Sequence, residues 1–192
     1  MAKPASDLTP KARRTRASLI EAARVVIGRE GISGVRVMEV CDIAEVGRTS
    51  FYNYFEDADQ LIASVVEDTA QSLKNQFDAL HEGQPRGLVR LERCLEMILN
   101  LAVDDRETAM LITSLSQNAH TKPKLLHQEI ERELAGANRM GELSLTDEKR
   151  ESLTQFLTIA TMAICRELAL GNLGKDQITS QVGIMISACR SE

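Results

Sequence analysis

The sequence contains few aromatic residues, with no tryptophan, two tyrosines and four phenylalanines among 192 residues. Four of these six lie in the segment GRTSFYNYF, residues 47–55, and the other two are Phe77 and Phe156. Most of the chain must therefore pack without aromatic rings. The concentration in one segment indicates a particular role for residues 47–55, either in packing or in binding.

Cysteine and histidine are too scattered to form a recognisable zinc site. No CxxC motif occurs, and the three histidines do not combine with the cysteines at ligand spacing, so we expect no metal and no cofactor. Each cysteine lies among apolar residues, which indicates reduced, buried thiols. Redox sensing by a cysteine that precedes an arginine is the alternative. The cysteines are Cys41, Cys94 and the two that precede arginines, Cys165 and Cys189.

No apolar run approaches the length that a helix needs to cross a bilayer. The longest, FLTIATMAIC from Phe156, has ten residues. The basic N-terminus is not followed by an apolar signal core, so secretion is not expected. With 43% hydrophobic and 27% charged residues, the composition is typical of a soluble globular protein. We expect a cytoplasmic protein without membrane contact.

The charges are unevenly distributed along the chain. A net charge of −5 argues against a general nucleic-acid binder. However, residues 1–50 carry nine Lys or Arg against six Asp or Glu, whereas the remaining 142 residues carry 14 against 22. A basic N-terminal part permits DNA binding by one end of the protein. The alternative is a basic helix whose charged face is only solvated.

The sequence pattern predicts an all-α fold. Period-two alternation with β-branched residues never persists long enough to indicate a strand. The first helix has the clearest limits, because Thr9 is a suitable N-cap, Pro10 suits the first helical position and Gly31 suits the position after the last turn. Between them, apolar residues recur at spacings of three and four.

Turn-forming segments divide the rest of the chain into further helices. HEGQPRG at 81–87 and GANRMGELSL at 136–145 are the most loop-like of these segments, and Asp57 and Thr146 are suitable N-caps. The expected helices cover 37–44, 48–55, 58–80, 85–103, 106–118, 123–134, 147–173 and 176–189.

The last two expected helices are apolar on more than one face. The stretch Leu153–Leu170 exceeds a single apolar stripe, and Ile178–Ile186 is similar. Gly183 permits close approach of a neighbouring helix. Two such helices favour a homodimer joined by a four-helix interface. The alternative is a central position in a monomeric bundle.

The aromatic segment also carries side chains suited to the DNA major groove. Phe51 and Phe55 lie four residues apart, so on a helix they would pack inward and leave the polar residues outward. Thr and Ser bond phosphates or base edges, Asn pairs with adenine and Arg with guanine, and Tyr hydroxyls reach phosphates. The alternative is a cluster that only joins two helices. The expected DNA contacts are Arg48, Thr49, Ser50, Tyr52, Asn53 and Tyr54.

Residues 14–62 resemble the helix-turn-helix domain of the TetR family of bacterial regulators. Their sequence is RTRASLIEAARVVIGREGISGVRVMEVCDIAEVGRTSFYNYFEDADQLI. The run Thr49–Phe55 resembles the family's recognition helix and the residues that close it, and Leu61 matches the apolar residue opening the fourth helix. The match extends without a gap from about Lys11 to Val66. In the first helix the matching residues are Arg16, Leu19, Ile20, Ala22, Ala23, Ile27 and Gly31.

Four residues depart from the family's pattern. Glu45 occupies a turn position that favours glycine, at a cost on the order of 1 kcal/mol if its φ is positive. Gly47 is a weaker N-cap than serine. Arg36 replaces a capping threonine and is expected to reach a phosphate without capping, while Ala58 replaces a phosphate-binding lysine. These departures predict weaker or more salt-sensitive DNA binding than the family norm.

The resemblance implies an arm at 1–10, a helix-turn-helix DNA-binding domain at 11–57, and a larger helical ligand-binding and dimerisation domain at 58–192. It also implies a function: a ligand-responsive transcriptional regulator, more often a repressor in this family. Such a regulator acts as a homodimer on a palindromic operator in double-stranded DNA. The fourth helix would couple the two domains.

The candidate effector pocket lies among the four expected helices between residues 85 and 173. Met and Leu with a few polar residues suit a small apolar or amphipathic effector, although plain core is the alternative. No charged cluster indicates an ionic ligand, and Glu129, Glu131 and Glu133 are expected on a solvated face. The candidate lining residues are Met97, Ile98, Leu101, Met110, Leu111, Ser114, Phe156, Ile159 and Met162.

Two other classes of function have less support. No nucleophile elbow, phosphate loop, metal spacing or catalytic carboxylate pair is present in the sequence, so we do not expect an enzyme. A helical protein-interaction adaptor that has lost DNA binding is compatible with the departures at Glu45, Gly47 and Ala58. The adaptor predicts no salt-dependent DNA affinity.

Overall fold

The computed structural model describes residues 9–80, 82–117 and 124–190, and within these ranges every regular element is helical, as predicted. The chain divides into two compact units, Met1–Gln71 and Ser72–Glu192, and the division falls inside α4 (Ala58–Leu80). None of the described helices combines the length and the hydropathy needed to span a bilayer.

The first unit is built around α1 (Pro10–Glu30), whose limits are those that the sequence predicts. The hydroxyl of Thr9 accepts a hydrogen bond from the Ala12 N–H at 3.3 Å, and Pro10 occupies the first turn. Gly31, at φ 76°, ends the helix and donates its N–H to the carbonyl of Ile27 at 2.8 Å. Glycine adopts this positive φ without steric cost.

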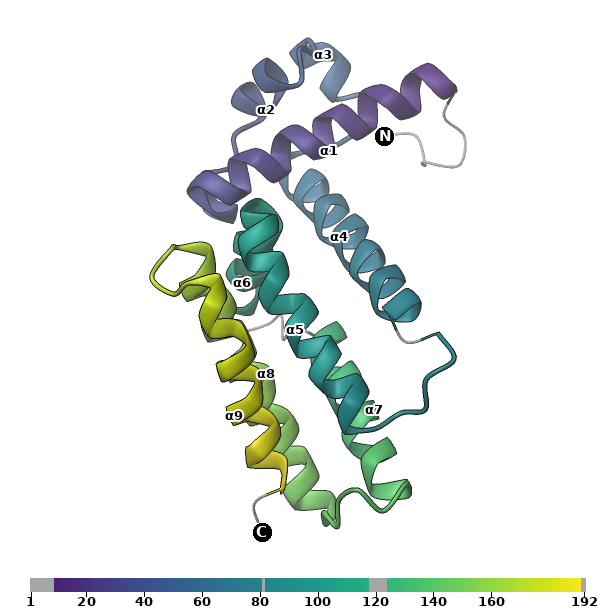
Figure 1. Ribbon diagram of the computed structural model, residues 1–192. Helices are drawn as coiled ribbons and strands as arrows, with labels where there is room; N and C mark the ends of the chain where they lie inside the picture. The colour runs from purple at the N-terminus through teal and green to yellow at the C-terminus, as the bar shows by residue number, and fades with distance from the viewer. Residues whose placement is uncertain (1–8, 81, 118–123, 191–192) are drawn as a thin grey trace. The chain divides into compact units, whose positions relative to one another are not determined.

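Short elements complete this unit. The 3-10 turn η2 (Ile32–Gly34) and α2 (Val37–Ile43) pack against α1, and α3 (Arg48–Phe51) packs against α2 (Figure 1). Apolar side chains from four helices close its core, and these are fully or almost fully buried: Leu19, Ile27, Val40, Phe51, Phe55, Leu61 and Val65.

The second unit is a helical bundle in which α5 is central. In Figure 1, α5 packs against α6, α7, α8 and α9, and α8 packs in turn against α6 and α7. Its core is almost entirely aliphatic, since Phe77 is its one buried aromatic side chain among the described residues. The helices are α5 (Leu88–Asp104), α6 (Arg106–Gln117), α7 (Lys124–Arg139), α8 (Asp147–Ala169) and α9 (Ile178–Arg190), the last preceded by η3 (Lys175–Gln177).

Helix α7 extends beyond the predicted end at residue 134, so the loop expected from residue 136 is wrong for 136–139. Gly136 lies inside the helix because another part of the chain approaches it closely. A Cβ atom on Gly136 would lie 2.4 Å from the Cβ of Arg86. The glycine therefore permits a contact between the α4–α5 connection and α7, rather than ending a helix.

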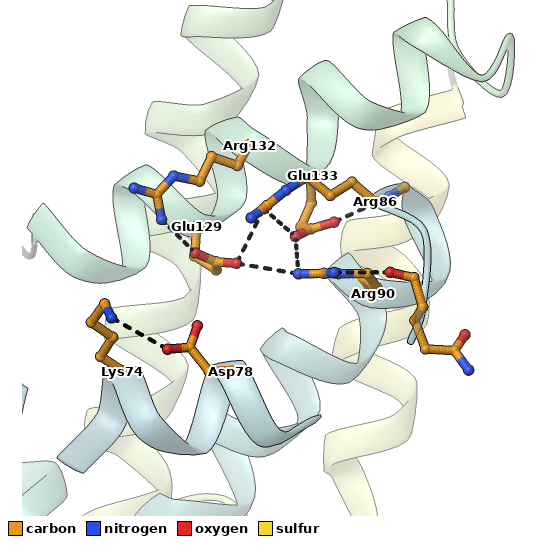
Figure 2. Close-up of polar contacts among 9 residues, drawn as sticks. Lys74, Asp78, Arg86, Arg90, Glu129, Arg132 and Glu133 are labelled. Carbon is orange, nitrogen blue, oxygen red and sulfur yellow. Dashed lines mark hydrogen bonds and ion pairs between the residues drawn. The ribbon is translucent and has the colours of Figure 1, made fainter. Parts of the chain in front are cut away.

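The acidic residues of α7 are not all solvated, which corrects the expectation for Glu129 and Glu133. Glu133 is 0% exposed and Glu129 is 5% exposed, whereas the side chain of Glu131 is 45% exposed. Figure 2 shows the two buried carboxylates among three arginine side chains. Helical periodicity identifies one face of α7 but does not reveal that arginines from another segment cover it.

Glu133 is the centre of this network. Its carboxylate accepts hydrogen bonds from Arg86 Nη1 at 2.8 Å and from the Gly87 N–H at 3.0 Å, and it lies 3.0 Å from Arg90 Nη2. Burial raises the pKa of Glu133, against the lowering effects of the Gly87 N–H and of the two arginines. Because desolvation offsets most of the attraction, such a network specifies position more than it adds net stability.

The network also determines where α5 begins. Glu133 accepts the N–H of Gly87, and a second carboxylate, that of Glu142, accepts the N–H of Leu88 at 2.8 Å. N–H groups at the start of a helix have no partner within the helix, and this end of the helix favours nearby negative charge. The helix therefore starts at Leu88 and not at the predicted Pro85.

All four cysteines are buried. Burial raises the pKa of Cys165 to about 12 and that of Cys189 to about 11, and it also raises the pKa values of Cys41 and Cys94. Because the thiolate is the reactive species, these thiols are poorly suited to redox sensing. Buried structural thiols therefore describe Cys165 and Cys189 better than the redox alternative does.

Replacement of Glu133 tests the network. Glu133→Gln removes one carboxylate and leaves Arg86 and Arg90 to share Glu129, so we expect the free energy of unfolding to fall by about 3 kcal/mol. Urea unfolding followed by circular dichroism measures the change. Glu131→Gln, on the same helix but paired with Arg150 only near the surface at 3.6 Å, should change stability by less than about 1 kcal/mol. Equal effects of the two variants would contradict this role for Glu133.

Candidate nucleic-acid interface

The connection from α2 to α3 is a tight turn with one strained residue. The Val46 N–H donates to the carbonyl of Cys41 at 2.9 Å, and between them Glu45 has φ 53°. Among the described residues Glu45 is the one non-glycine residue at positive φ. The turn therefore has the conformation in which glutamate costs on the order of 1 kcal/mol relative to glycine.

Helix α3 is shorter than the predicted 48–55. Its α-helical part ends at Phe51, and the N–H groups of Asn53 and Tyr54 donate to carbonyls three residues earlier, at 3.1 and 2.9 Å. Gly47 is the N-cap and forms no side-chain cap. A helix of this length is not stable by itself in water, so tertiary packing must hold it.

Two phenylalanines provide that packing. Phe51 is 0% exposed and Phe55 is 1% exposed, and their ring centroids lie 5.6 Å apart. The ring of Tyr52 meets that of Phe51 edge to face at 5.3 Å. Edge-to-face aromatic pairs are favourable beyond the area that they bury. The inward position predicted for Phe51 and Phe55 is confirmed.

The polar residues of the segment lie on the opposite side from these rings. The side chain of Tyr54 is half-buried, and Tyr52 is 45% exposed. The structure thus brings the expected DNA contacts of this segment together on one short element with an open surface. The other exposed members are Arg48, Thr49, Ser50 and Asn53.

Arg36 precedes α2 and forms no cap, as expected. Its Nη1 donates to the carbonyl of Gly34 at 3.1 Å and lies 3.8 Å from the carboxylate of Glu30. The side chain is 71% exposed, so a phosphate could compete for the guanidinium. At the start of α1, Lys11 and Arg14 are also exposed; the basic run in the sequence is the signal that identifies them.

The start of α4 presents carboxylates rather than a lysine. Asp57 caps the helix by accepting the Gln60 N–H at 2.8 Å, and Gln60 in turn accepts the Glu56 N–H at 2.6 Å. Ala58 is half-buried, and Asp59 is exposed. Several acidic side chains therefore lie within a few residues of the recognition segment, where they disfavour an approaching phosphate.

The expected effector-lining residues differ in burial. Ile98, Leu111 and Met162 are buried, and four others are half-buried: Met97, Leu101, Met110 and Ser114. Phe156 and Ile159 differ, since they are 53% and 61% exposed on α8. These two side chains face away from the core of their own unit.

Residues 19–65 match the sequence model of the bacterial regulatory proteins of the TetR family. The matched range covers α1 from its first buried leucine, the turn, α3 and the start of α4. Residues 19–65 therefore form a helix-turn-helix domain of the TetR type. The proteins that this sequence model describes are bacterial regulators.

Solved structures of TetR-like proteins share the fold over most of the chain. A TetR-like transcriptional regulator from Rhodococcus sp. RHA1 is 16% identical, with a TM-score of 0.75 over 94% of this chain and 97% of its own. The fatty acid degradation regulator FadR from Bacillus halodurans is 14% identical, with a TM-score of 0.75 over 97% and 100%. FadR from Bacillus subtilis, in complex with stearoyl-CoA, is 14% identical, with a TM-score of 0.73 over 89% and 97%. No curated protein matches the chain.

Glycine at position 45 should stabilise this TetR-family domain. Glu45→Gly relieves the positive φ, so we expect the first unit to gain about 1 kcal/mol. Hydrogen exchange of the α1 and α2 amides reports this unit separately from the bundle. Glu45→Gln keeps a side chain on the strained backbone and should give no such gain. If hydrogen exchange slows in both variants, the gain in stability comes from removing the charge of Glu45 and not from relieving backbone strain.

Proposed function

We propose that the chain is a cytoplasmic, ligand-responsive regulator, most simply a repressor, that binds a palindromic operator as a homodimer. The observation that carries the proposal is the two-sided recognition segment, with Phe51 and Phe55 buried and an open polar surface opposite them. Residues 11–57 would form the DNA-binding domain, and 58–192 the ligand-binding and dimerisation domain.

Each expected contact has a role that fits its chemistry. Arg48 would pair with guanine and Asn53 with adenine, the two residue types that bind these bases bidentately. Thr49 and Ser50, at the start of α3, would bond phosphates or base edges. The hydroxyls of Tyr52 and Tyr54, with Arg36 from the adjacent α2, would contact the backbone.

DNA affinity should be modest and strongly dependent on salt. The start of α4 contributes the carboxylates of Glu56, Asp57 and Asp59 in place of a lysine. Arg36 also lies near Glu30. Because phosphate contacts dominate affinity for DNA, fewer free cations near the backbone weaken binding at physiological ionic strength.

Exposed apolar residues of α8 and α9 support a dimer through these helices. Ile159 is 61% exposed and Ile184 is 62% exposed, and Phe156 is 53% exposed on α8. Gly183 is exposed, and a Cβ on it would meet nothing within 4 Å, so another helix could approach there. A second copy of the chain would cover these surfaces and also Phe156.

The effector would be a small apolar or amphipathic molecule bound in the helical bundle. The bundle offers aliphatic and Met side chains, half-buried at Met97 and Met110. One structural relative is in complex with stearoyl-CoA, and long-chain acyl-CoA is accordingly the first class to test. By linkage, an effector weakens DNA binding by the factor by which DNA weakens effector binding.

Selection from genomic DNA tests the proposal. Fragments of the source genome are incubated with the wild-type protein or with a Tyr52→Ala/Asn53→Ala variant at matched salt, recovered and sequenced. We expect the wild type alone to enrich a palindromic site, because the variant lacks base and backbone contacts but keeps both phenylalanines.

Asp68→Ala, an exposed change on α4 in the same unit, serves as the matched control and should enrich the same site as the wild type. A folded dimer that enriches no site at low salt would contradict the proposal and favour the protein-binding adaptor. Enrichment that survives in the Tyr52→Ala/Asn53→Ala variant would instead place the specific contacts at residues other than Tyr52 and Asn53.

A single charge should disrupt the dimer. Ile159→Glu places a carboxylate on the apolar surface of α8, and burying it unpaired costs several kcal/mol, so we expect sedimentation to show a monomer where the wild type is a dimer. Val89→Glu introduces the same charge at an apolar residue of α5 that is 54% exposed, and this variant should remain dimeric. If both variants remain dimeric, this surface of α8 is not the dimer interface.

A further inference from the structure

Arg16, on α1, connects three parts of the first unit through its guanidinium group. The group lies over the ring of Phe55, 5.3 Å from the ring centroid, and its Nη2 donates to the hydroxyl of Ser64 on α4 at 2.9 Å. A planar guanidinium can stack on a ring with its face and donate with its edge at the same time. Lysine cannot make both contacts in this geometry.

The contacts continue from Phe55 toward the recognition surface. The Phe55 ring lies 5.6 Å from that of Phe51, and Phe51 meets Tyr52 at 5.3 Å with an interplanar angle of 86°. Phe51 and Phe55 are almost completely buried, while Tyr52 is 45% exposed. An unbroken series of side-chain contacts therefore runs from Ser64 through Arg16 to an expected DNA contact.

The same helix that carries Ser64 continues into the second unit. Helix α4 buries one residue in four along its length, with Leu61 and Val65 before the division and Leu73 and Phe77 after it. Leu73 and Phe77 belong to the core of the helical bundle. Ser64 lies in the part of α4 that belongs to the first unit, so a displacement of that part of the helix moves Ser64 with it.

We propose that Arg16 is a positioning residue that couples α4 to the recognition segment and orients Tyr52 for specific DNA. The inference rests on the proposed DNA-binding function for its consequence, although the coupling itself lies within one unit of the chain. Packed interfaces shift between discrete arrangements rather than deforming continuously, so Arg16 transfers a displacement of α4 to the rings. Arg16 itself need not contact DNA.

The first arm of the test needs no DNA. The chain has no tryptophan and only two tyrosines, so in a Tyr54→Phe background Tyr52 is the sole emitter. Acrylamide quenching of Tyr52 emission is compared between this protein and its Arg16→Met variant. Arg16→Met should change the accessibility of Tyr52, and Ser64→Ala should change it less, because the stacking on Phe55 remains. Arg14→Met removes an equal charge from the same helix and should leave it unchanged.

The second arm compares affinity for the selected operator with affinity for a scrambled duplex at matched salt. Arg16→Met should lower the ratio of operator affinity to scrambled-duplex affinity about tenfold, as expected for the loss of a stacked, hydrogen-bonded cation. Arg16→Lys keeps the charge but not the planar guanidinium group, so it should show most of the same loss of operator preference. Arg14→Met should weaken both affinities together, because it removes only charge.

The outcomes separate the two claims. Unchanged Tyr52 quenching in Arg16→Met would overturn the coupling, and so would an unchanged ratio of specific to non-specific affinity. A changed quenching in a protein whose wild type selects no site would support the coupling and overturn the regulator function. Thermal unfolding of Arg16→Met within a few degrees of the wild type confirms that the effects arise in a folded protein.

Discussion

Burial of Phe51 and Phe55 is the interaction on which the recognition surface depends. A four-residue helix has no independent stability, and each buried phenylalanine contributes roughly 1.5–3 kcal/mol relative to an exposed one. These two rings hold α3 against the first unit, and the polar residues between and beside them are consequently exposed. The concentration of aromatics in residues 47–55 thus serves packing and presentation together.

The second unit is held together by aliphatic packing and a buried ionic network instead of clustered aromatic rings. Its core is aliphatic, and a buried network around Glu133 holds the start of α5 against α7. Close approach at Gly136 belongs to the same arrangement. The end of the α4–α5 connection is therefore firmly placed.

Local signals in the sequence predicted the DNA-binding unit well. Thr9, Pro10 and Gly31 mark α1 because caps act within a few residues, and the positive φ of Glu45 follows from its place in the turn. The resemblance to the TetR family aided this part because its matches fall there. Which exposed residues touch DNA stays a prediction, since contact depends on a partner.

Tertiary contacts explain the errors in the second unit. The expectation of a loop from residue 136 fails because the role of Gly136 depends on the close approach of Arg86, which is distant in sequence. The expectation of a solvated face for Glu129 and Glu133 fails because periodicity does not reveal that arginines from outside α7 contact it. Exposure of Phe156 and Ile159 likewise depends on what packs against α8.

The central claim is that the open face of α3 reads DNA sequence. Selection from a random duplex library with the wild type and with Arg48→Ala tests it most directly. The account predicts that Arg48→Ala loses preference at one base pair in each half-site, by about 1–3 kcal/mol, and retains the rest of the motif. An identical motif from both proteins, or no motif from a folded wild-type dimer, would contradict it.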